Sequence, residues 1–207
     1  MKKANKKRFL VTALIALCLL VGWLVWGNTA LQLNEITVSS ERLPQSFDGY
    51  RIVQVSDLHN AVFGQANEKL LQLIRDAKPD MIVLTGDLVD SSHTDLDIAI
   101  RFVQKSVEIA PTYYVTGNHE AWLGNSYETL EQKLSRGGVT ILRDEAMYIE
   151  EEGERILLMG LDDPEFYEGE SAIYDGGAFV MQQRIDSLRY DNEVYTILLS
   201  HRPELFD

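Results

Sequence analysis

Four apolar segments of this sequence are each followed at once by side chains that can hold a metal ion or move a proton. These side chains stand in Ser56-Asp57-Leu58-His59, Gly86-Asp87-Leu88-Val89-Asp90, Gly117-Asn118-His119-Glu120 and Ser200-His201-Arg202-Pro203. Carboxylate, imidazole and amide ligands without a thiolate suit Mn, Fe, Zn or Mg better than a structural zinc site. The pattern therefore predicts a metal site assembled from four separate stretches of the chain.

The spacing inside these stretches agrees with metal binding. Asp57 and His59 are two residues apart, so in an extended segment their side chains point the same way, with Cα atoms roughly 7 Å apart. Asp87 offers two oxygens and can bridge two cations, whereas Asn118 offers a neutral carbonyl oxygen that adds no negative charge. Together these residue types can surround a pair of divalent ions.

Each stretch taken alone has an ordinary structural explanation. An aspartate at the end of a strand is more often a turn former or a helix cap than a ligand, and His201 by itself could be a hydrogen-bonded structural histidine. The order of the stretches favours the metal site, because three of the four histidines directly follow an apolar strand. The fourth, His93, lies in a polar linker and is predicted to be solvated. The alternative is a plain α/β interaction domain with polar turns.

The elements that must position these residues form a regular alternation. Residues 51–56, 81–85 and 112–116 read as strands, and residues 68–77 and 95–107 read as amphipathic helices between them. Strands that alternate with such helices predict βαβ units and a largely parallel sheet. Because parallel strands end at the same edge of a sheet, the four polar stretches are expected to meet there.

The rest of the body is less regular but still rich in strands. We expect two further helices, over residues 127–136 and 178–188. We also expect further strands, over residues 139–142, 147–150, 155–161 and 193–199. This mixture predicts a second sheet packed on the first. We also expect Asn67 to cap the helix over 68–77, and the helix over 95–107 to start at Thr94 with Asp97 in the capping-box position.

The N-terminal region has the charge pattern of a membrane anchor. Residues 1–8 form a basic tail, and residues 9–27 carry no formal charge over a length that can cross a hydrocarbon core of roughly 30 Å. The basic tail predicts a single-pass protein of the cell membrane with its N-terminus inside and its C-terminal domain extracytoplasmic. A cleaved signal peptide is the alternative, although the apolar run ends in large residues instead of small ones. Residues 28–45 are expected to be a tether with a possible edge strand around Ile36 and Val38, and residues 46–207 a single domain.

Composition excludes several other classes of protein. The formal net charge is −13, and after Arg8 only 14 basic residues face 32 acidic ones, so the body repels phosphate backbones and is no typical binder of duplex nucleic acid. The lone cysteine, Cys18, excludes an internal disulfide framework and a thiolate-rich metal cluster.

The ordered motifs resemble those of a known family. Asp57-x-His59, Gly86-Asp87-x-x-Asp90, Gly117-Asn118-His119-Glu120 and His201 are similar, in this order, to the motifs of the calcineurin-like metallophosphoesterases. Residues 43–49 and 160–164 most resemble the membrane-anchored bacterial branch of that superfamily. The resemblance implies an α/β fold in which a sandwich of two β-sheets is flanked by helices.

The same resemblance implies a role for each motif residue. It implies two divalent ions whose ligands are Asp57 and His59 for the first, Asp87 for both, and Asn118 and His201 for the second. His119 would be the non-ligand catalytic histidine near the leaving group, and Asp90 would orient its neighbours. Asp162 and Asp163 receive no role, since a turn before Pro164 explains them equally well.

The implied activity is hydrolysis of phosphomonoesters or phosphodiesters, with lipid or envelope phosphates as plausible substrates. Two cations roughly 3.5–4 Å apart lower the pKa of a shared water, and the bridging hydroxide attacks phosphorus. One departure stands out: the Gly-His-x-His motif that closes the family pattern is absent, and the sequence stops six residues after His201. We therefore expect a C-terminally incomplete chain. The alternatives are a fragment that is inactive for this reason, or a non-catalytic metal-dependent binding or sensor domain.

Overall fold

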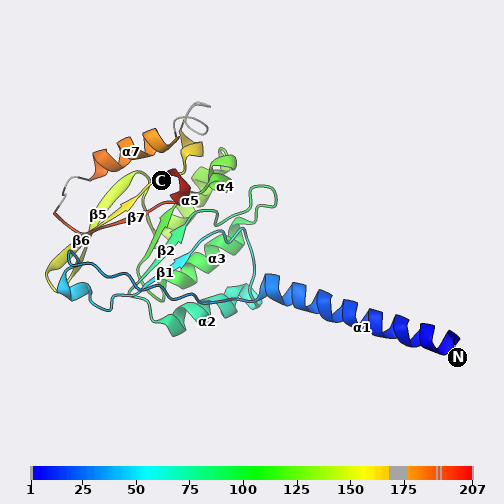
Figure 1. Ribbon diagram of the computed structural model, residues 1–207. Coiled ribbons are helices and arrows are strands. Elements are labelled where there is room, and N and C mark those ends of the chain that lie inside the picture. Colours follow the sequence, from blue (N-terminus) through cyan, green and yellow to red (C-terminus); the bar gives the residue numbers. More distant parts are fainter. Residues whose placement is uncertain (1, 168–176, 190, 192, 207) are drawn as a thin grey trace. The chain divides into compact units, whose positions relative to one another are not determined.

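The computed structural model describes residues 2–167, 177–189, 191 and 193–206 (Figure 1). The chain divides into two compact units, Met1–Ile36 and Thr37–Asp207. The first unit is built on helix α1 (Lys2–Thr29), in which the 22 residues Lys6–Gly27 are long and apolar enough to cross a membrane. At 1.5 Å per residue they extend about 33 Å, close to the thickness of a hydrocarbon core.

The second unit contains a four-stranded parallel sheet with strand order β1-β2-β3-β4. Its strands are β1 (Ile52–Val55), β2 (Met81–Thr85), β3 (Thr112–Val115) and β4 (Thr140–Ile141). The helices between them are α2 (Glu68–Ala77), α3 (Leu96–Val107), α4 (Asn118–Trp122) and α5 (Ser126–Arg136). All five residues of β2 are buried, because this central strand is covered on both faces. The predicted βαβ arrangement is confirmed.

A second, mixed sheet has the strand order β5-β6-β7. Strands β5 (Glu145–Glu151) and β6 (Glu154–Gly160) are antiparallel, and the left-handed residues Glu152 and Gly153 form the tight turn that joins them. Strand β7 (Thr196–Leu199) pairs with β6 in parallel, and helix α7 (Gly177–Leu188) precedes it. Short 3₁₀ turns complete the described elements: Gln45–Phe47, Gln65–Asn67, Pro164–Phe166 and Pro203–Phe206.

The two sheets pack face to face over one apolar core. Buried side chains from both sheets meet there: Met81, Val83, Tyr113, Val115, Ile149, Ile156, Leu158 and Leu199. Helix α7 covers the other face of the second sheet, where Met181 and Ile185 pack against Leu157 and Met159. Helices α2 and α3 lie on the opposite side of the first sheet (Figure 1). The predicted fold, a two-sheet sandwich flanked by helices, is confirmed.

Two helix caps differ from the sequence-based expectation. Asn67 adopts a left-handed conformation (φ 65°), and its side chain accepts a hydrogen bond from the Phe63 N–H (2.7 Å) instead of capping α2. Helix α3 is capped by Asp95 and not by Thr94, because the Asp95 carboxylate accepts from the Asp97 N–H at 3.0 Å. A carboxylate at this position also favours the positive end of the helix dipole.

The possible edge strand around Ile36 and Val38 does not form. Residues 30–40 are irregular, and both side chains are exposed. An isolated strand without a neighbouring backbone to pair with has no hydrogen-bond partners to stabilise it. The alternation of polar and apolar residues in this segment therefore does not reflect burial against a sheet.

Candidate metal centre

The loop after β1 runs alongside the loop after β2. The N–H groups of Asp57 and His59 donate to the carbonyl oxygens of Gly86 (3.1 Å) and Asp87 (2.9 Å). Asp57 and His59 have φ values of 55° and 45°, so the expectation of an extended segment was wrong. The turn still brings the two side chains together, with His59 Nε2 3.6 Å from Asp57 Oδ1. The backbone bonds to the neighbouring loop, not the pleat of a strand, set this geometry.

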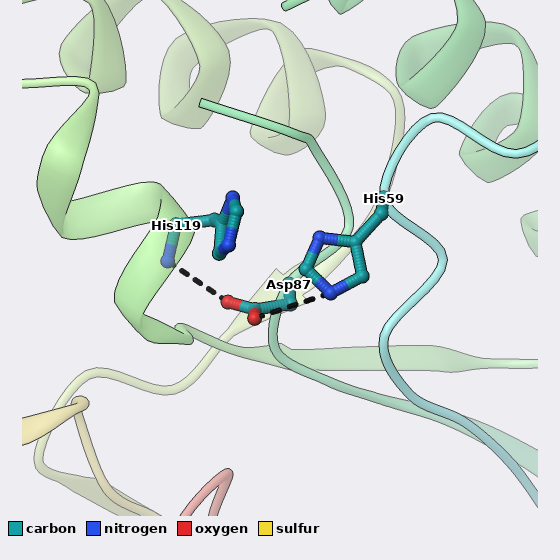
Figure 2. A group of neighbouring side chains, drawn as sticks. All are labelled: His59, Asp87 and His119. Atoms are coloured by element: carbon teal, nitrogen blue, oxygen red, sulfur yellow. Dashed lines mark hydrogen bonds and ion pairs between the residues drawn. The ribbon is translucent and has the colours of Figure 1, made fainter. Parts of the chain in front are cut away.

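Asp87 lies at the centre of the polar cluster (Figure 2). Its Oδ2 is 3.4 Å from Nε2 of His59 and 3.4 Å from Nε2 of His201, while its Oδ1 accepts the backbone N–H of His119 at 2.9 Å. Burial acts to raise the pKa of Asp87, but the hydrogen bonds from His201 and His119 outweigh it and lower that pKa. The carboxylate oxygen Oδ2 thus faces the imidazole of His59 and the imidazole of His201.

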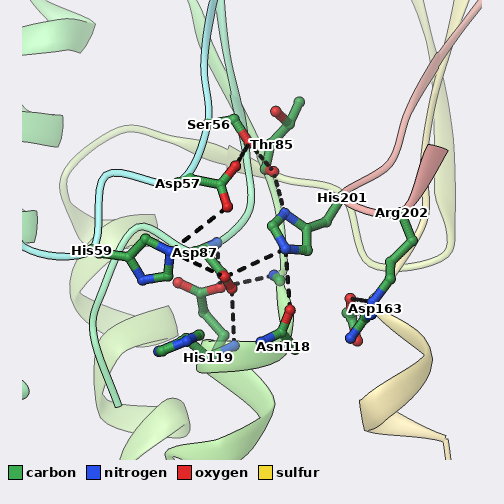
Figure 3. Close-up of polar contacts among 12 residues, drawn as sticks. Ser56, Asp57, His59, Thr85, Asp87, Asn118, His119, Asp163, His201 and Arg202 are labelled. Carbon is green, nitrogen blue, oxygen red and sulfur yellow. Dashed lines mark hydrogen bonds and ion pairs between the residues drawn. The ribbon is translucent and has the colours of Figure 1, made fainter. Parts of the chain in front are cut away.

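His201 is fixed in one tautomer by the end of β2. Its Nδ1 lies 2.9 Å from the carbonyl oxygen of Thr85, which can only accept, so Nδ1 carries a proton. Nε2 then faces Asp87 and Oδ1 of Asn118, the latter at 3.2 Å (Figure 3). Burial opposes the charge of His201, yet the bonds to Asp87 and Thr85 prevail and raise its pKa to about 9. A cation that takes up Nε2 therefore has to displace a proton.

His119 is the second residue of helix α4, which begins at Asn118 with Gly117 as its N-cap. Its Nδ1 accepts the N–H of Ser91 at 3.0 Å, and because a backbone N–H can only donate, the proton of the neutral ring is on Nε2. Asp90 lies 3.8 Å from Nδ1, and its Oδ1 accepts instead from the N–H and hydroxyl of Ser92 at 2.8 and 2.7 Å. Asp90 thus shapes the turn that carries Ser91 rather than binding His119 directly.

A sequence model of the calcineurin-like phosphoesterase domain matches residues 50–205. The chain belongs to this family. Metal-dependent hydrolysis of phosphate esters is the general chemistry of the calcineurin-like phosphoesterases, and divalent cations are their usual cofactors.

Relatives of this chain include curated proteins from animals and bacteria. A "Transmembrane protein with metallophosphoesterase domain" from Danio rerio is 25% identical over 82% of this chain and 38% of its own length. An "Uncharacterized metallophosphoesterase" from Aquifex aeolicus is 28% identical over 84% of this chain and 63% of its own length. The chain thus spans 38–63% of the length of these two relatives.

A solved structure supports the fold independently. The crystal structure of TT1561 from Thermus thermophilus aligns with a TM-score of 0.51 and 19% identity, covering 72% of this chain and 66% of that one. At this level of identity the likeness concerns the fold alone. It agrees with the two-sheet sandwich of this chain.

The donor atoms around Asp87 fit a divalent cation. Two groups of three residues have ligand atoms within 4.8 Å of one another, and both contain Asp87: His59, Asp87 and His119; Asp57, Asp87 and His201. Two ligand atoms held tetrahedrally about 2.1 Å from one ion lie about 3.4 Å apart. The separations of 3.4 Å around Asp87 Oδ2 match this value. The donors are oxygen and imidazole nitrogen only, a set that suits Mn, Fe, Zn or Mg.

The structure gathers the five candidate ligands of this chain and leaves His93 outside. Asp57, His59, Asp87, Asn118 and His201 are connected by the contacts given above (Figure 3). The His93 side chain is 88% exposed, which agrees with its prediction as a solvated residue.

Glu120 is the functional residue that sequence reasoning left without a role. It is fully buried, and its carboxylate accepts four backbone N–H groups, those of Asp87, Gly117, Leu88 and Val89, at 2.8, 2.8, 2.8 and 3.3 Å. Burial raises its pKa, although these bonds act in the opposite direction. The sequence does contain one indication of this role. Glu120 stands three residues after Gly117, and a carboxylate at that position can accept a hydrogen bond from the backbone N–H of the residue that caps a helix. Glu120 holds the loop that carries Asp87.

Two glycines let the loops approach closely. A Cβ on Gly86, which has φ 84°, would lie 2.6 Å from Nδ1 of His201. A Cβ on Gly117 would overlap Oδ1 of Asp87 and lie 2.5 Å from its backbone nitrogen. Any larger residue at these positions would displace His201 or Asp87.

Proposed function

We propose that this phosphoesterase hydrolyses phosphomonoesters or phosphodiesters with two divalent cations that share Asp87. Asp57 and His59 would hold the first cation, and Asn118 and His201 the second. The proposal rests above all on one observation, that Nε2 of His59 and Nε2 of His201 lie 3.4 Å from the same Oδ2 of Asp87. That arrangement suits a carboxylate oxygen shared between two ions.

Each residue of the site contributes a defined step in this proposal. When bound, the cations supply a nucleophile at neutral pH and neutralise charge on the phosphoryl oxygens. His119 would protonate the leaving oxygen from Nε2, since its Nδ1 is held by the Ser91 N–H. Because the protein body is acidic, cations at the site also offset its repulsion of a phosphate ester.

Replacement of His119 tests this proposal directly. His119→Gln is expected to lower kcat for an alkyl phosphate ester with Mn²⁺ on the order of 10²-fold, because it removes the proton donor. A nitrophenyl phosphate ester, whose leaving group has a low pKa and needs little protonation, should be affected less. His93→Gln, which changes an exposed histidine, is the matched control and should leave kcat unchanged. Equal kcat in wild type and His119→Gln for both leaving groups would refute the proposed role, and Mn²⁺ binding without hydrolysis would favour a binding or sensor domain.

We further propose that residues 9–27 anchor the protein, residues 28–45 act as a tether, and residues 46–207 form the catalytic domain outside the cytoplasm. The apolar helix with basic residues before it and the transmembrane relative from Danio rerio support this arrangement. An anchored domain meets phosphate esters of lipids or of the cell envelope at high local concentration. Such esters are the substrate class we propose.

Cysteine labelling tests the orientation. In a Cys18→Ser background, Glu128→Cys places a thiol at an exposed position of α5, and Asn5→Cys places one in the basic tail. In spheroplasts of bacteria that express the protein, a membrane-impermeant maleimide should label the first variant and not the second. The reverse pattern would place the domain in the cytoplasm, and a labelled protein that washes off the membrane would indicate a cleaved signal peptide.

A further inference from the structure

Two buried aspartates follow β6 at a point where the sequence indicated only a turn before Pro164. Asp162 and Asp163 are 6% and 1% exposed, and the structure gives both of them ionic partners. Among the described residues, no hydrogen bond or ion pair joins either of them to a side chain of the candidate metal ligands. Their hydrogen-bond partners Arg202 and Thr116, however, lie one and two residues in sequence from two of those ligands.

The first connection leads to His201. The carboxylate of Asp163, whose side chain is fully buried, accepts from Nε of Arg202 at 2.9 Å (Figure 3). Its other oxygen accepts the N–H of Glu165 at 2.9 Å. The remaining guanidinium nitrogens of Arg202 lie 3.7 Å from Glu165 and 3.9 Å from Glu204. Arg202 is therefore neither a free surface arginine nor an unpaired cation available to a phosphate.

The second connection leads to Asn118. The N–H of Asp163 donates to the hydroxyl oxygen of Thr116 at 2.9 Å, and this hydroxyl donates to Oδ1 of Asp162 at 2.8 Å. Thr116 is fully buried and stands two residues before Asn118. Arg143 holds Asp162 through Nε, at 2.9 Å from each carboxylate oxygen. The end of β3 is thus tied to the end of β6.

We propose that Asp163 is a positioning residue that fixes the His201 and Asn118 side of the metal centre. It clamps the loop after β7 through Arg202 and the loop after β3 through Thr116, and both loops carry candidate ligands of the same cation. Asp57 and His59, which would hold the other cation, lie on the loop after β1, and Asp163 has no hydrogen bond or ion pair to that loop among the described residues. This inference rests on the proposed two-cation function. Groups that orient metal ligands typically change metal affinity by about 10–100-fold when removed.

Binding of Mn²⁺ alone, followed by calorimetry, tests the inference. Asp163→Asn keeps the size of the side chain and removes its charge. Of two Mn²⁺ equivalents, one is expected to weaken by about 10–100-fold and the other to change by less than about threefold. Glu68→Gln, which removes an exposed 2.6 Å ion pair with Arg75 on α2, is the matched control and should change neither. Equal weakening of both equivalents would overturn the inference, because a general electrostatic or stability effect would act on both.

A double-mutant cycle shows whether the effect passes through His201. In a His201→Ala background, Asp163→Asn should weaken Mn²⁺ binding by less than about twofold, because the residue to be positioned is gone. A full effect in that background would contradict the inference.

Hydrogen exchange of the metal-free protein separates this inference from the proposed function. Asp163→Asn should accelerate amide exchange at residues 201, 202, 204 and 205, and Glu68→Gln should not. If wild type binds no Mn²⁺, the two-cation function fails, and the exchange rates still decide whether Asp163 holds the loop. Unchanged exchange in Asp163→Asn would overturn the inference in either case.

Discussion

Asp87→Asn is expected to abolish metal-dependent hydrolysis while the protein stays folded. The amide oxygen can still accept the N–H of His119, as Oδ1 of Asp87 does at 2.9 Å. The amide nitrogen then faces His59 and His201, where it offers hydrogens instead of a lone pair and cannot bind a cation. With both cation positions affected, we expect kcat/KM for a nitrophenyl phosphate ester with Mn²⁺ to fall by roughly 10⁴-fold or more.

The matched control for this variant is Asp76→Asn, which changes an exposed aspartate on α2. It should leave both kcat/KM and Mn²⁺ binding unchanged. Thermal unfolding of the two variants reports whether each protein is folded at the assay temperature. Undiminished turnover by folded Asp87→Asn would remove Asp87 from the site and with it the shared-oxygen arrangement.

Glu120→Gln is expected to destabilise the protein by about 3 kcal/mol, since hydrogen bonds to a charged group are each worth about 1.5–3 kcal/mol. The carboxylate satisfies four buried N–H groups, whereas glutamine has one carbonyl oxygen and turns its own N–H₂ toward donors. Because the loop of Asp87 is held by these bonds, Mn²⁺ affinity should fall as well. Urea unfolding measures the first effect and calorimetry the second.

Glu128→Gln on α5 serves as the control, because Glu128 is exposed and makes only a 3.4 Å contact with Gln132 among the hydrogen bonds of the described residues. Its free energy of unfolding should change by less than about 0.5 kcal/mol, as is usual for surface substitutions. A similarly small change in Glu120→Gln would mean that the buried carboxylate does not support the Asp87 loop.

The regular elements were predictable because burial imposes a period on the sequence. Helix α2 has the predicted bounds, Glu68–Ala77, since Leu70, Leu71 and Ile74 recur at helical spacing and are buried. Strand β2 was equally clear, because a central parallel strand is apolar on both faces. The edge strand around Ile36 failed for the converse reason, because alternation alone does not supply a neighbouring strand.

The sequence by itself determined that three polar stretches gather at the carboxyl ends of β1, β2 and β3, because parallel βαβ units bring successive strand ends to one edge. The expectation that the fourth stretch ends a strand of the same sheet was wrong: His201 follows β7 of the second sheet, and only the packing of the two sheets brings it to that edge. Only the tertiary structure decided how those residues face one another. The turn at Asp57, the single oxygen that Asp87 presents to two imidazoles, and the backbone bonds of Glu120 all depend on contacts between loops far apart in the chain. Local periodicity reports burial within one element, whereas hydrogen bonds between separate loops leave no periodic trace in the sequence.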